Sequence, residues 1–188
     1  METILRGTIY QRGVSLIELM ISLTIVAIVL ISVGPSVQGI LIQNRIVAEL
    51  NELSGIIQFA RNNAIDQQFA TVVCPSQDFS NCTTSWDDPK IVFTDLDNNG
   101  IRGSDEELLV ASSAIAGVNY LTGPGQKIIF QASGAADIPA TLLLCHSSKS
   151  AKYARALLVS LQGRVKMSRD PDNNGIYEDD EGTALACL

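Results

Sequence analysis

Residues 12–35 read RGVSLIELMISLTIVAIVLISVGP and contain a single acidic residue, Glu18. After Glu18 the chain has no charged side chain until Arg45. This run is long enough to cross a bilayer, which takes about 20 apolar residues. Placing a carboxylate within a membrane segment costs free energy, so the sequence predicts a functional role for Glu18.

The segment differs from a cleaved secretory signal, because its apolar region is longer and no small-residue cleavage site follows it. It resembles the class III signal of type IV pilins and pseudopilins, a short basic leader that ends in glycine, with a glutamate five residues into the mature chain. The resemblance implies that a prepilin peptidase cuts between Gly13 and Val14 and methylates the new amine of Val14. Glu18 matches the family's glutamate and Pro35 its helix-softening proline, whereas Val14 stands where phenylalanine is usual.

The resemblance also gives Glu18 a partner. The carboxylate would pair with the Val14 amine of a neighbouring subunit and set the axial register of helices packed in a filament. Two alternatives remain at this point. The segment could be a plain signal anchor, and the Glu18 carboxylate could reach the lipid headgroups.

The length of the rest of the chain indicates one domain of ordinary size, and its composition gives the protein a net negative charge. The 188 residues carry a formal net charge of -7. Cleavage after Gly13 would leave 11 basic and 19 acidic residues and a net charge of -8. Such a protein is not expected to bind nucleic acid over its whole surface, so any such binding must be local.

The hydrophobic pattern changes after Pro35, where apolar residues recur at steps of three or four as far as Ala64. This spacing predicts an amphipathic helix, so that one helix runs from about residue 14 to residue 66. Beyond it, short apolar segments alternate with turn-forming residues, as in strands. Predicted strands are residues 70–73, 91–94, 108–111, 127–131, 141–145, 156–161 and 164–167, and predicted loops are residues 117–125 and 133–139.

The predicted fold is therefore α+β and pilin-like, with a long N-terminal helix on a small antiparallel β-sheet or sandwich. Its expected parts are a leader (1–13), a membrane-spanning filament-core helix (14–37), the amphipathic half of the helix (38–66) and a periplasmic β-rich domain (67–188). The order VVCPS, C, W, IVFTDLDNNG and EELL, followed by LLVSLQGRVK, resembles the GspH/FimT family of minor pilins and minor pseudopilins.

All four cysteines follow the predicted membrane span. Basic residues before the span keep its N-terminus cytoplasmic, so the cysteines face an oxidising compartment and predict two disulfides. Four cysteines allow three pairings, of which we expect Cys74–Cys82, across a short loop, and Cys145–Cys187. A zinc site is the alternative, but the chain has one histidine and no Cys-x-x-Cys pair.

One short motif occurs twice. Residues 95–106 and 170–181 both fit D-x-D-x-N-G followed by a glutamate at the twelfth position, the oxygen spacing of a calcium loop. The side-chain ligands would be Asp95, Asp97, Asn99 and Glu106 in the first loop, and Asp170, Asp172, Asn174 and Glu181 in the second. The flanks are strand-like, which excludes an EF-hand domain. The alternative is a pair of tight Asn-Gly turns without any ion.

Basic residues gather near the C-terminus, where no acidic residue occurs between Ile138 and Arg169. A basic strip on an acidic protein predicts contact with DNA phosphates. The strip consists of Lys149, Lys152, Arg155, Arg164, Lys166 and Arg169, with His146 beside it. Members of the FimT branch that bind DNA carry G-R-x-R near this point, whereas this chain has lysine at position 166, which lacks the bidentate fork. The alternative is that these cations pair with the acidic residues of 170–181.

No nucleophile elbow, P-loop or zinc-protease motif occurs, so the sequence predicts no enzyme and no required cofactor. The resemblance implies a minor pilin of a type IV pilus, at or near the filament tip, with a role in DNA uptake. Its partners would be other pilins, the prepilin peptidase and the inner-membrane assembly platform. The chain would cross the inner membrane once, with its C-terminal domain in the periplasm, before it enters the filament. Two alternatives are an H-type minor pseudopilin of a type II secretion system and a calcium-dependent surface-binding module.

Overall fold

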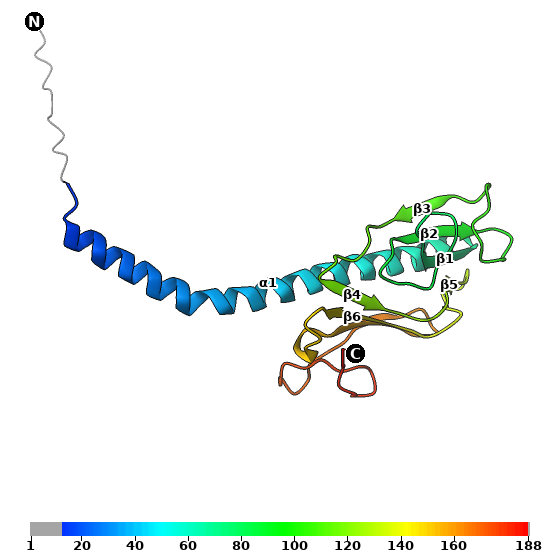
Figure 1. The fold of residues 1–188 in the computed structure, drawn as a ribbon. Helices are drawn as coiled ribbons and strands as arrows, with labels where there is room; N and C mark the ends of the chain where they lie inside the picture. The colour runs from blue at the N-terminus through cyan, green and yellow to red at the C-terminus, as the bar shows by residue number, and fades with distance from the viewer. Residues whose placement is uncertain (1–12, 188) are drawn as a thin grey trace, which may run out of the picture. The chain divides into compact units, whose positions relative to one another are not determined.

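The computed structural model describes residues 13–187, except for the side chains of residues 32–36. Of the predicted leader only Gly13 lies within the described residues, and the side chain of Pro35 lies outside them. The chain divides into two compact units, Met1–Leu41 and Ile42–Leu188. The helix α1 (Leu16–Gln67) contributes to both units (Figure 1).

Within the first unit, α1 begins directly after Ser15, which acts as its N-terminal cap. The Ser15 hydroxyl accepts the backbone N–H of Glu18 at 3.3 Å, and the Ser15 carbonyl accepts that of Leu19 at 3.1 Å. The few polar side chains of the apolar run are satisfied inside the helix, as when Thr24 donates to the Met20 carbonyl at 2.8 Å. Such bonds let hydroxyl groups lie in apolar surroundings without an outside partner.

Within the second unit, one stripe of α1 is buried, with the three-and-four spacing expected from the sequence. The buried apolar residues of this stripe are Ile46, Leu50, Leu53, Ile56, Ile57, Ala60 and Ala64. The helix ends at Gln67, and Gln68 follows with a φ of 61°, a left-handed conformation that is common just beyond helix ends.

Two four-stranded antiparallel sheets complete the second unit. The first has the order β3-β2-β1-β5. Its strands are β1 (Ala70–Pro75), β2 (Lys90–Asp95), β3 (Leu108–Ala111) and β5 (Ile128–Phe130). The second has the order β4-β6-β7-β8. Its strands are β4 (Asn119–Thr122), β6 (Ala140–His146), β7 (Arg155–Val159) and β8 (Val165–Met167), and a short 3₁₀ helix, η1 (Ala151–Tyr153), precedes β7.

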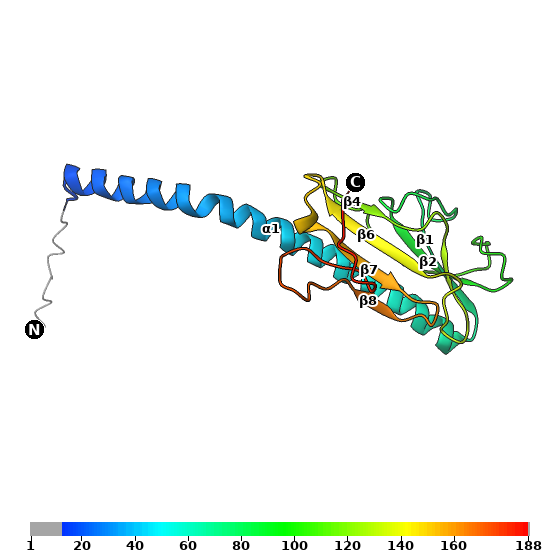
Figure 2. The same cartoon turned by 90° about the horizontal axis from the view of Figure 1, so that it is seen from below.

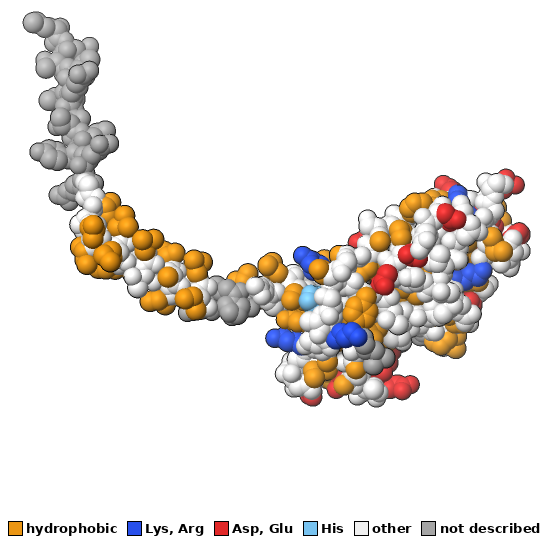
Figure 3. Space-filling view, in the orientation of Figure 1, with side chains coloured by type: hydrophobic (Ala, Val, Ile, Leu, Met, Phe, Trp, Pro, Cys, Tyr) orange, Lys and Arg blue, Asp and Glu red, His pale blue; other side chains and the backbone are white. Residues whose placement is uncertain are grey.

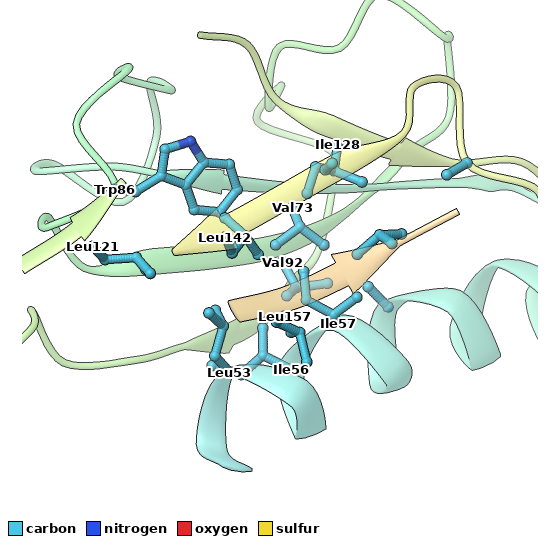
Figure 4. Close-up of a cluster of buried hydrophobic side chains, with 14 of the residues drawn as sticks. Leu53, Ile56, Ile57, Val73, Trp86, Val92, Leu121, Ile128, Leu142 and Leu157 are labelled. Carbon is cyan, nitrogen blue, oxygen red and sulfur yellow. The ribbon is translucent and has the colours of Figure 1, made fainter. Parts of the chain in front are cut away.

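The main core lies where both sheets meet the buried stripe of α1. Figure 4 shows Val73 and Val92 of the first sheet close to Leu142 and Leu157 of the second, with Ile57 of α1 beside them. Figure 2 shows β6, β7 and β8 running along the helix. Because one stripe of α1 packs against both sheets, the fold is α+β and pilin-like, as the sequence predicts.

One strand was not predicted. Residues 117–125 were expected to form a loop, but they contain β4, which pairs with β6 from Asn119 to Thr122. The glycines on both sides of this four-residue strand hide it in the sequence. Gly123 is needed for packing, because a Cβ atom there would come within 2.6 Å of the Trp86 ring.

Both expected disulfides are present. Cys74 is bonded to Cys82, and Cys145 is bonded to Cys187. The second bond ties the C-terminal segment to β6 across 42 positions of sequence. Leu185 of that segment is buried against the same face of the second sheet, so this face is covered by the end of the chain.

Candidate functional site

The first unit presents an apolar helical surface. Every described side chain from residue 13 to residue 31 is exposed, with Val14 at 69% and Leu16 at 79%. Figure 3 shows hydrophobic side chains covering this segment. A continuous apolar surface of this extent is typical of a segment that contacts a partner or a membrane. Over the described residues, no helix meets the combined length and apolarity expected of a membrane crossing.

Glu18 lies in the first turn of α1, where its side chain is exposed. Ser15 caps the helix and Glu18 stands three positions later, the S-x-x-E pattern of a capping box. A carboxylate in this turn also interacts favourably with the positive end of the helix dipole. The spacing of Ser15 and Glu18 is the sequence signal for this local role, which was not predicted. The same placement sets the carboxylate four residues from Val14.

Arg155 does not belong to an exposed basic strip, which corrects the sequence prediction. Its side chain is buried, and its guanidinium carbon lies 3.3 Å from the centre of the Tyr177 ring. Its Nη1 also donates to the carbonyls of Lys152 at 2.9 Å and Ala154 at 2.7 Å. Burial lowers the pKa of Arg155, and Tyr177 partly opposes this change. Arg155 is therefore part of the packing of the second sheet.

The remaining cations of the predicted strip do not form one patch. Lys149 and Lys152 lie in the connection before β7, whereas Arg164 lies in the turn after it, so the five residues of β7 separate them. At about 3.3 Å per residue, that strand is about 16 Å long. Lys166 forms an ion pair with Asp180 at 3.0 Å. A high density of basic residues in the sequence therefore becomes separate groups in the structure.

The first acidic loop brings its predicted side chains together. Asp95, Asp97 and Glu106 each place one oxygen within 4.8 Å of the others, a donor set that fits calcium. The carboxylates are already engaged, since Asp95 accepts the N–H of Gly100 at 2.8 Å and Glu106 that of Leu96 at 2.7 Å. Burial raises the pKa of Asp95, and the Glu106 carboxylate raises it further.

Two more features bear on this loop. The side-chain amide of Asn99 donates to the Asp97 carboxylate at 2.6 Å, so two of the predicted calcium ligands are hydrogen-bonded to each other. The ammonium of Lys127 donates to the Gly100 carbonyl, which places a positive charge beside the loop. A calcium ion would have to replace some of these bonds and tolerate that charge.

The second acidic loop repeats the turn but not the full ligand set. Asp170 accepts the N–H of Asn174 at 3.1 Å, and Asp172 accepts the side-chain amide of Asn174 at 2.7 Å, as in the first loop. Glu181 does not join them, because it lies in a separate turn in which the Asp179 carboxylate accepts its N–H at 2.9 Å. Within residues 13–187, the first loop alone gathers three acidic or metal-binding side chains.

Comparison with known proteins supports the same family from two directions. A family model described as Type II transport protein GspH matches residues 49–163, which is more than half of the chain. The chain belongs to the GspH family. A second model, the prokaryotic N-terminal methylation motif, matches residues 9–34. The GspH model thus covers part of the second unit, whereas the methylation motif covers Gly13, Val14 and Glu18.

Solved structures show the GspH fold at low sequence identity. The type IV minor pilin FimU from Pseudomonas aeruginosa PAO1, in space group P21, is 18% identical over 78% of this chain and 97% of its own, with a TM-score of 0.57. In space group P65 it is 17% identical over 73% of this chain and 96% of its own, with a TM-score of 0.51. The minor pseudopilin EpsH from the type 2 secretion system of Vibrio cholerae is a weaker likeness, 10% identical over 64% of this chain and 93% of its own, with a TM-score of 0.48. No curated protein sequence matches the chain.

Proposed function

We propose that this chain is a minor pilin of a type IV pilus, a non-enzymatic subunit that functions in filament assembly. The observation that carries the proposal is the start of α1. An exposed apolar helix begins at Leu16, the third residue after the predicted cleavage point, is capped by Ser15, and holds Glu18 in its first turn. The match to the methylation motif supports the same interpretation.

In this proposal, cleavage after Gly13 creates the amine that Glu18 needs. The prepilin peptidase exposes and methylates the amine of Val14, which carries a positive charge. That amine pairs with the Glu18 carboxylate of the next subunit, in an apolar bundle where two unpaired charges would cost free energy. The pairing sets the register, and the apolar side chains of residues 14–31 supply the contact area.

The proposed localisation is based on the same apolar segment and on the methylation motif. Before assembly the subunit is anchored in the inner membrane, which residues 14–37 cross. Its N-terminus lies in the cytoplasm and its β-rich unit in the periplasm. The assembly platform then moves it into a filament of other pilins, at or near the tip. The two disulfides suit an oxidising compartment.

Replacement of Glu18 tests this assembly role. Glu18→Gln keeps the size of the side chain but removes the charge, so the protein should stay in the membrane fraction and disappear from sheared filaments. Glu52→Gln is the matched control, since it removes an exposed carboxylate from the same helix within the second unit. Incorporation of Glu18→Gln at the wild-type level would overturn the pairing.

The alternative within the same family is a minor pseudopilin of a type II secretion system. Deletion of the gene separates the two, because loss of surface pili with normal secretion supports the pilus role. Loss of protein secretion with normal piliation would support the secretion role instead.

DNA contact is a second candidate function, and one observation favours it. Arg164 is exposed at the turn after β7 and has no carboxylate partner among the described residues. Contact would be limited to the phosphate backbone, because residues 13–187 form no element of a known kind that reads base edges. The predicted G-R-x-R-like motif cannot act alone, since Lys166 is paired with Asp180.

A further inference from the structure

Two arginine side chains from distant parts of the chain line one hollow in the second unit. Arg61 comes from α1, and Arg164 comes from the turn between β7 and β8. The hollow has a volume of about 160 Å³ and is also lined by Gln58, Asn62, Gly163 and Val165. No carboxylate is among these lining residues.

Close packing at Gly163 holds Arg61 beside Arg164. The Nε of Arg61 donates to the carbonyl of Gly134 at 3.0 Å, which fixes the side chain over the β7–β8 turn. A Cβ atom on Gly163 would collide with that carbonyl and would come within 2.7 Å of the Arg61 Nε. Gly163 also has a φ of 73°, which favours glycine. The turn therefore brings residue 164 directly next to the Arg61 side chain.

The positive charge of this pair is not neutralised within residues 13–187, where the ion pair present is that of Lys166 with Asp180. The Nε of Arg61 is bonded to the Gly134 carbonyl, while the two terminal nitrogens of its guanidinium are left for a ligand. Guanidinium groups offer a planar fork that matches a phosphate in two-point contact. A pair of them without a carboxylate therefore favours an anionic oxygen ligand.

We propose that Arg61 and Arg164 form a binding site for one phosphate group of a nucleic-acid backbone. The inference rests on the DNA contact proposed above and adds Arg61, a residue outside the basic segment. The hollow is smaller than the roughly 300–1,000 Å³ of a typical small-molecule pocket, so it fits one group of a larger ligand. It has no aromatic side chain on which a base could stack, so contact is with the backbone and independent of base sequence.

The test measures binding of the full-length protein, in neutral-detergent micelles, to a fluorescein-labelled 20-nucleotide single strand and the matching duplex. Fluorescence anisotropy at several salt concentrations gives the affinity and its salt dependence. Arg61→Gln and Arg164→Gln should each weaken binding about tenfold and reduce the salt slope by about one. Lys149→Gln and Lys152→Gln are the controls, which remove exposed charges at the other end of β7 and should change affinity less than about twofold.

Three results would overturn the proposal. The first is wild-type DNA affinity in a folded Arg61→Gln variant, with Arg61→Lys and the melting temperature used to separate lost packing from lost charge. The second is an equal loss in all four variants, which would mean a general charge effect. The third is binding of inorganic phosphate, or of phosphatidylglycerol vesicles, that depends on both arginines while DNA binding does not. Because Glu18→Gln is read out in filaments, failure of the assembly proposal is distinguishable from failure of this one.

Discussion

The guanidinium of Arg155 lies over the ring of Tyr177, with 3.3 Å between the Arg155 Cζ atom and the ring centroid. Arg155 is the first residue of β7, and Tyr177 belongs to the C-terminal segment that covers the second sheet. The contact and the Cys145–Cys187 bond therefore fix the same segment to the same face. It also explains why a basic residue at this position is not available to a ligand.

Removal of the Arg155 side chain is expected to destabilise the second unit by about 2–4 kcal/mol, because a stacked cation and two carbonyl hydrogen bonds are lost together. A double-mutant cycle with Tyr177→Leu should give a coupling of about 1–2 kcal/mol. Chemical unfolding of the single and double variants measures both values. Lys152→Ala, at an exposed position nearby, is the control. Additive effects of Arg155→Ala and Tyr177→Leu would show that the stacking is energetically irrelevant.

The burial of Lys90 predicts that the stability of the fold rises with pH in the alkaline range. Its Nζ is buried without a hydrogen-bond partner among the described residues, and burial lowers its pKa to about 8 in spite of Asp87 and Glu52 nearby. Between pH 8 and the ordinary lysine value of about 10.4, the unfolded chain binds more protons than the folded one, so Lys90 makes stability rise with pH. Below pH 8 both states are protonated, and the cost of the buried charge is constant.

Lys90→Met isolates this effect, because it keeps an unbranched side chain only one atom shorter and removes the charge. The variant should be more stable than the wild type at pH 7, by at most about 3 kcal/mol, and the gap should close as the pH rises from 8 towards 10.4. Denaturant unfolding across this range measures the gap. Parallel pH profiles for the two proteins would refute the account of Lys90.

Gly163 and Gly175 both have a left-handed backbone conformation. Comparing their alanine variants separates the cost of backbone strain from the cost of a steric clash. Gly163 and Gly175 have φ values of 73° and 87°, but a Cβ atom collides with neighbours only at Gly163. Gly175→Ala should cost about 1 kcal/mol from backbone strain alone, whereas Gly163→Ala should cost at least 1–3 kcal/mol more. Melting temperatures rank the two variants. Equal losses would mean that the turn at Gly163 is not packed against Gly134 and Arg61.

A calcium site, the alternative to two turns without an ion, is limited by the structure to the first loop. Asp95 and Glu106 converge, whereas Glu181 is held away from Asp170. Calcium at about 1 mM, near the affinity of extracellular sites, should raise the melting temperature of the wild type and of Asp170→Ala, but not that of Asp95→Ala. Loss of the response in both variants, or no response in the wild type, would mean that the two loops are turns without an ion.

The sequence predicted the features that depend on local pattern. The spacing from Ile46 to Ala64 identified the buried stripe of α1, and the short segment between Cys74 and Cys82 indicated their pairing. β4 was missed because four residues between glycines carry too little periodicity to distinguish a strand from a loop. The Ser15 cap was within reach of local reasoning, since its partner is three residues away.

The charged sites were harder to predict, because they depend on which parts of the chain come together. Arg155 was counted as exposed, since its partner Tyr177 lies in a segment with no detectable strand pattern. Arg61 looked like an ordinary surface residue of an amphipathic helix, and its proximity to Arg164 follows only from the position of the β7–β8 turn. Burial of Lys90 likewise follows from how β2 meets the rest of the unit.

Intact-mass spectrometry of the purified protein, from cells with an active prepilin peptidase, determines whether the chain is a processed pilin. We expect a chain that starts at Val14, has lost residues 1–13 and carries one methyl group on its new amine. A Gly13→Val variant, blocked at the cleavage point, should keep the leader and stay out of filaments. A wild-type chain that still carries residues 1–13 would contradict the assignment as a processed filament subunit.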